Sequence, residues 1–67
     1  MLYNIYRMNR TELFQVKKIS KYFQAKDFTD FHFNESDNLI IFYGGKLKKK
    51  GFYCNKMVLD AVVDVVL

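Results

Sequence analysis

The sequence has one cysteine, one histidine, three glycines and neither proline nor tryptophan. Because Cys54 is the lone cysteine, the chain forms no internal disulfide. Cys54 and His32 together also fall short of the four Cys or His ligands that a structural zinc ion normally requires. These shortages exclude two common supports of small domains, and we expect no metal and no cofactor.

Long apolar runs are absent as well. The longest apolar stretch, residues 57–67, contains Asp60 and Asp64 and is much shorter than the roughly 20 residues that span a bilayer. The opening residues, MLYNIY, precede Arg7 instead of following a basic segment, so they do not match a secretory signal. Together with the unpaired cysteine, these features predict a cytoplasmic protein without a membrane partner.

The length of 67 residues predicts a single domain, residues 1–67. A chain of this size buries only roughly 60% of its unfolded surface, so its core needs support. The aromatic content of 18% predicts that dense packing of Phe and Tyr rings provides that support. Self-association, as in a homodimer, is the alternative.

The formal net charge of +4 favours an anionic partner. All the basic residues except Arg7 and Arg10 are lysines, and the chain is also rich in Asn, Ile, Phe and Tyr. All of these residues have AT-rich codons, so a biased genome explains part of the lysine excess. Net charge therefore supports a nucleic-acid partner only weakly.

The first half of the chain predicts a helix over residues 10–25. Asn9 and Glu12 have the spacing of a capping box. The apolar positions that follow share one helical face: Leu13, Val16, Ile19 and Phe23, with Ser20. Residues 2–8 are aromatic and favour a strand, and the alternative is a hairpin that turns through NRT into residues 12–19.

The middle of the chain predicts a β-hairpin. Residues 29–33 alternate between apolar and polar, NESDN is rich in turn formers, and residues 39–43 form a continuous apolar run. Residues 51–54 (GFYC) predict a third strand beside the second. We expect the lysine-rich segment between them to form a flexible loop.

Residues 55–67 fit either a helix capped by Asn55 or a strand rich in valine. We favour the helix because the segment runs without Gly or Pro for longer than most strands. The predicted fold is α+β, with a small antiparallel sheet of about three to four strands and two helices packed on one face.

The segment YGGKLKKKGFYC raises the question of a phosphate site. A P-loop needs two glycines four residues apart, followed by Lys and a hydroxyl residue, whereas Gly44 and Gly45 are adjacent. The remaining interpretations are a solvated turn whose lysines discourage edge pairing, a phosphate contact, or a contact with an acidic protein surface. The lysines concerned are Lys46, Lys48, Lys49 and Lys50.

The polar face of the first predicted helix is a second candidate surface. Basic groups around an aromatic ring suit single-stranded nucleic acid or a protein interface, unless the ring is covered and the lysines are only solvated. We predict partner binding by Phe14, Lys17, Lys18, Lys21 and Tyr22. The broad apolar arc of the last helix predicts self-association through Leu59, Val62 and Val66, with burial inside the monomer as the alternative.

Catalytic chemistry is not indicated. His32 lies between two phenylalanines and has no nucleophile or orienting group at a meaningful spacing, and Cys54 is expected to be buried. The carboxylates around residues 27–37 are expected to cap and bend the chain. An enzyme would require His32 and Cys54 to meet in three dimensions.

The sequence thus predicts a small non-catalytic binding protein. Its size and lysine-rich composition are typical of phage and mobile-element accessory proteins, which modulate or inhibit a host protein or protein complex. The alternative is a sequence-nonspecific nucleic-acid-binding protein that uses the basic aromatic face and the lysine segment.

Overall fold

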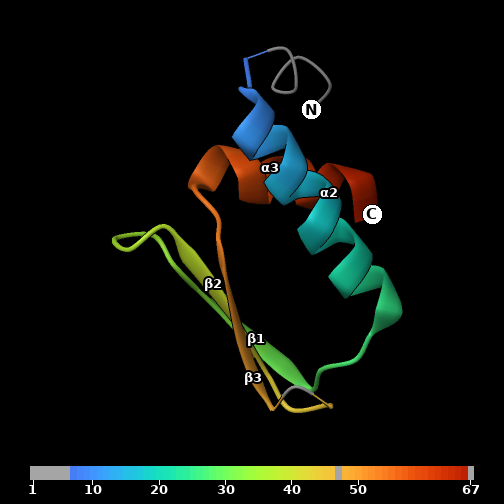
Figure 1. The fold of residues 1–67 in the computed structure, drawn as a ribbon. Coiled ribbons are helices and arrows are strands. Elements are labelled where there is room, and N and C mark those ends of the chain that lie inside the picture. The colour runs from blue at the N-terminus through green and yellow to red at the C-terminus, as the bar shows by residue number, and fades with distance from the viewer. Residues whose placement is uncertain (1–6, 47, 67) are drawn as a thin grey trace.

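The computed structural model describes residues 7–46 and 48–66. The strands form one antiparallel sheet in the order β1-β2-β3, and both helices lie on the same side of it (Figure 1). The predicted α+β fold is therefore confirmed. In chain order the elements are α2 (Arg10–Ala25), β1 (Asp30–Asn34), β2 (Leu39–Tyr43), β3 (Lys49–Tyr53) and α3 (Lys56–Val66).

Both predicted helices are present, which excludes the hairpin alternative for residues 12–19 and the strand alternative for the C-terminal segment. The strand predicted over residues 2–8 lies mostly outside the described residues. Arg7 and Met8, which are described, belong to no strand. The prediction for β3 was wrong at its start. The antiparallel ladder extends through Lys50 and Lys49, which pair with Phe42 and Tyr43, so β3 begins two residues before Gly51.

Hydrogen bonds at the two helix starts join α2 to α3. The Asn9 side chain accepts from the Glu12 amide at 2.8 Å, and one Glu12 carboxylate oxygen accepts from the Asn9 amide at 3.1 Å. The second Glu12 oxygen accepts from the Asn55 side-chain amide at 2.7 Å. Asn55 in turn caps α3, because its side-chain oxygen accepts from the Val58 amide at 2.8 Å. Glu12 therefore connects the caps of both helices.

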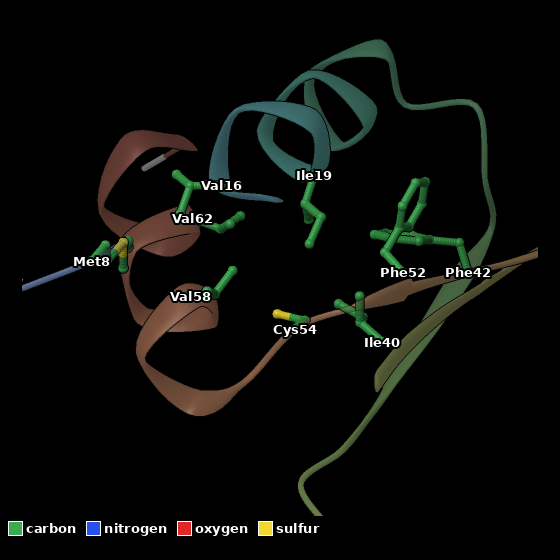
Figure 2. Close-up of a cluster of buried hydrophobic side chains, with 10 residues drawn as sticks. Met8, Val16, Ile19, Ile40, Phe42, Phe52, Cys54, Val58 and Val62 are labelled. Atoms are coloured by element: carbon green, nitrogen blue, oxygen red, sulfur yellow. The ribbon is translucent and has the colours of Figure 1, made fainter. Parts of the chain in front are cut away.

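The core fills the space between the helices and the sheet (Figure 2). Ile19 of α2 points between the valines of α3 and the aromatic side chains of the sheet. Register explains which strand residues take part: Phe31 pairs with Phe42, and Ile40 pairs with Phe52, so all four share the face under the helices. The buried apolar residues are Met8, Val16, Ile19, Ile40, Phe42, Phe52, Cys54, Val58, Ala61 and Val62.

Phe42 is the centre of an aromatic cluster and is 1% exposed. Its ring centroid lies 4.5 Å from that of Tyr22 and 4.8 Å from that of Phe28. Phe23 and Phe52 follow at 5.1 Å and 5.7 Å. Mostly tilted and edge-to-face contacts of this kind add to the stabilisation from burial alone. Dense aromatic packing is therefore present, as predicted.

The link between the helix starts should be measurable as an energetic coupling. We expect Glu12→Ala and Asn55→Ala each to lower the free energy of unfolding by about 1–2 kcal/mol, because each removes capping hydrogen bonds. The double variant should lose less than the sum, with a coupling of about 0.5–1.5 kcal/mol. Urea unfolding of the four proteins measures this. Strict additivity would show that the Glu12–Asn55 bond contributes nothing.

A second prediction concerns Cys54, which is 1% exposed. Burial raises the pKa of the Cys54 thiol from 9.0 to about 11. The unfolded thiol loses its proton first as the pH rises, so the contribution of Cys54 to stability is complete below about pH 9 and is lost towards pH 11.

We expect the stability difference between the wild type and Cys54→Ala to shrink by on the order of 2 kcal/mol over this pH range. Urea unfolding of both proteins at either end of the range measures the change. The alanine variant corrects for every other contribution to the pH dependence of stability. A constant difference would contradict the burial of the thiol.

Candidate binding groove between α2 and β3

The lysine-rich segment is divided among three places in the fold. Lys46 and Lys48 belong to the turn between β2 and β3, where the Lys46 amide donates to the Asp27 carboxylate at 3.3 Å. Gly45 has a φ of 69°, and a Cβ at this position would collide with the Asp27 carbonyl. The turn is therefore packed on the connection between α2 and β1.

The remaining two lysines point to opposite sides of the sheet. Lys49 pairs with Tyr43 and shares the outer face with it, whereas Lys50 pairs with Phe42 and lies on the face under the helices. Only Lys50 therefore joins the helix surface that the sequence predicts to bind a partner.

Lysines from α2 and β3 meet over the ring of Phe52. The Lys18 ammonium lies 5.3 Å from the ring centroid, and the Lys50 ammonium lies 5.7 Å from it. Both distances suit a cation–π contact, which attracts each ammonium group to the ring although the two groups repel each other. Two lysines that are far apart in sequence thus meet on one surface.

This surface is hollowed into a groove that runs between α2 and β3 and continues onto the adjoining face of α2. Three adjoining hollows of about 210, 390 and 200 Å³ share Lys18. Phe52 lines the first two and Phe14 lines the first and third. We call this surface the lysine groove; it is lined by Thr11, Phe14, Gln15, Lys17, Lys18, Ile19, Lys21, Tyr22, Ala25, Lys50, Gly51, Phe52 and Tyr53.

Every charged side chain that lines the lysine groove is a lysine. Among the described residues, none that lines it is acidic. Within the same part of the chain, Lys17, Lys18, Lys21 and Lys50 make no ion pair, whereas Lys56 pairs with Asp60 at 3.2 Å on α3. The groove therefore presents uncompensated ammonium groups around apolar rings.

The Phe14 side chain of the groove is open to solvent, because it is 64% exposed. Tyr53 is 74% exposed, but its ring shares the outer face of the sheet with Lys49, so Tyr53 borders the groove through its backbone. Tyr22 differs, because its ring belongs to the aromatic cluster and its hydroxyl donates to the Asp27 carbonyl at 3.3 Å. The predicted partner-binding set is therefore brought together on one surface, with Tyr22 as a largely structural member.

His32 and Cys54, the two residues considered for catalysis, lie on opposite sides of the sheet. His32 is exposed on the outer face of the sheet, and Cys54 is buried on the opposite side. The carboxylates act in local structure: Asp30 accepts from the Phe31 amide, and the Asp37 side chain bonds with Asn34 in the β1–β2 turn. The described residues contain no group of three or more acidic, His or Cys side chains that could hold a metal ion.

The residues predicted for self-association line a different hollow. It has a volume of about 330 Å³ and entirely apolar walls formed by Phe23, Phe31, Leu59, Val62, Val63 and Val66. Val62 is only 1% exposed and belongs to the monomer core as well. Leu59 and Val66 are half-buried, so self-association remains a prediction.

Sequence reasoning missed the part that β3 plays in the groove. It assigned Lys50 to a loop and gave no role to Phe52 or Tyr53. The signal was the alternation of Lys50, Phe52 and Cys54, which places these residues on one face of a strand that starts earlier.

Comparisons with family models, curated proteins and solved structures give no significant match to this chain. Within the described residues, neither helix is long and apolar enough to cross a membrane.

The exposure of Phe14 leads to a stability prediction. We expect Phe14→Ala to change the free energy of unfolding by less than about 0.5 kcal/mol, because its ring makes little buried contact. Phe42→Ala should cost about 3–5 kcal/mol, since it removes the centre of the aromatic cluster. Thermal or urea unfolding measures both. A loss at Phe14 comparable to that at Phe42 would mean that Phe14 supports the fold instead of being available to a partner.

Proposed function

We propose that this chain is a non-catalytic protein-binding module that binds an acidic surface of a partner protein in the lysine groove. The observation that carries the proposal is the meeting of Lys18 and Lys50 over Phe52, in a groove whose described lining contains no carboxylate. Holding like charges together disfavours the isolated protein, and an acidic partner relieves this repulsion.

The exposed Phe14 ring provides the second part of the argument. Phe14 is large and solvent-exposed, and Lys17, Lys18 and Lys50 line the hollows beside it. Aromatic anchors surrounded by a charged rim are typical of the residues that dominate binding energy in protein interfaces. Occupying a partner's acidic surface in this way is how so small a chain would modulate or inhibit a host protein.

A nucleic-acid partner is the second candidate, and the same exposed ring favours it. A base can stack on Phe14 while the lysines contact phosphates. This mode predicts a steep loss of affinity with salt, because each neutralised phosphate releases counterions. Nuclease treatment separates the two candidates, because it destroys a nucleic-acid partner and leaves a protein partner intact.

The test compares two double variants with the same change in charge. Lys18→Glu/Lys50→Glu reverses the charge inside the groove, whereas Lys46→Glu/Lys49→Glu reverses it at the turn and on the outer face. Tagged proteins are used to capture partners from nuclease-treated native lysate. We expect the wild type and the turn variant to retain the same protein, and the groove variant to retain at least about tenfold less.

Equal loss in both double variants would show that net charge, and not the groove, controls retention. Retention that disappears for the wild type after nuclease treatment would favour the nucleic-acid candidate. Circular dichroism of each variant confirms that it is folded before it is compared.

A further inference from the structure

The free edge of β3 borders the lysine groove. In the sheet that residues 7–46 and 48–66 form, β2 lies between β1 and β3, so β3 pairs on one side only. An unpaired strand edge presents a row of N–H and C=O groups that another extended chain can bind. Gly51 and Tyr53 line the first hollow of the groove, so this edge is accessible from it.

The register identifies which backbone groups face outward. The Cys54 amide donates to the Asn38 carbonyl at 2.9 Å, and the Gly44 amide donates to the Lys48 carbonyl at 2.7 Å. Because hydrogen-bonded and non-bonded pairs alternate in an antiparallel ladder, the residues of β3 that bond to β2 are Lys50 and Phe52. The N–H and C=O groups of Lys49, Gly51 and Tyr53 therefore point to the free edge.

Gly51 has no structural explanation within the monomer. Its φ is not in the left-handed region, and a Cβ at this position would lie 3.6 Å from the nearest atom of Leu39, which is an ordinary contact. Alanine would therefore fit and would favour the strand. A glycine in a strand often marks a place where another backbone approaches closely.

We infer that the partner segment binds as an added β-strand on the edge of β3, and that it is an extended acidic peptide. Its backbone bonds to Lys49, Gly51 and Tyr53. Alternate side chains turn under α2, where acidic groups meet Lys18 and Lys50. This inference rests on the proposed function, because it concerns how the same groove recognises its acidic partner.

The first experiment changes the edge without changing the β2–β3 ladder. Gly51→Pro removes an N–H that points outward, and proline is tolerated at such edge positions. Gly51→Ala keeps the N–H and is the matched control. The probes are synthetic peptides of about eight residues in which Glu or Asp alternates with Leu, Val or Tyr. We expect Gly51→Pro to lower the affinity for the tightest-binding peptide by at least about tenfold, and Gly51→Ala to lower it by less than about threefold.

The second experiment leaves the protein unchanged, so it stays decisive if Gly51→Pro does not fold. Successive peptide amides are N-methylated, which removes one donor at a time. We expect affinity to fall at every second position, since alternate residues of an added strand bond to the edge. In the free protein the amides of Gly51 and Tyr53 should exchange rapidly with solvent, and peptide binding should slow them.

The outcomes separate this inference from the proposed function. Peptide binding that is lost in Lys18→Glu/Lys50→Glu, but is indifferent to Gly51→Pro and to methylation, would support the groove and overturn strand addition. Binding that is indifferent to the lysine variant would overturn both. Protection of the Gly51 and Tyr53 amides in the free monomer would show that other residues of the same chain occupy the edge. Protection only at concentrations where the chain self-associates would show that a second copy occupies it. Either result also overturns the inference.

Discussion

The hydrogen bond between Glu12 and Asn55 sets the geometry on which the rest of the molecule depends. Glu12 is in the first turn of α2, and Asn55 lies between β3 and α3. This bond holds the start of α2 against the end of β3, at one end of the lysine groove. Because Asn55 also caps α3, the same residue sets the direction of that helix as it leaves the sheet.

The aromatic cluster holds the other end of the molecule together. Tyr22 and Phe23 come from the last turns of α2, Phe28 from the connection that follows, and all three pack on Phe42 of the central strand. A chain with a single cysteine forms no internal disulfide, so it depends on such a cluster, because a domain of this size buries a limited fraction of its surface. The groove lies between these two attachments, so its walls rest on well-packed elements.

The elements were predictable where a local pattern was complete. The Asn9–Glu12 box and the apolar period identified α2 with its observed bounds, and Asn55 identified the start of α3. The start of β3 was not predictable, because a run of lysines has no hydrophobic period and its strand character comes from pairing with Phe42 and Tyr43. The meeting of Lys18 and Lys50 depends on that pairing, so the sequence did not indicate that one lysine of the second basic segment joins the surface of α2.

Lysines lie on both faces of the open edge of β3, and they also affect whether two copies of this chain associate edge to edge. Two β3 edges that approached each other would bring Lys49 and Lys50 close to their counterparts, and this repulsion opposes growth into a continuous intermolecular sheet. Acetylation of these two side chains would remove that protection. The same modification would lower the positive charge beside this edge, so it would also weaken the attraction for the acidic segment proposed above.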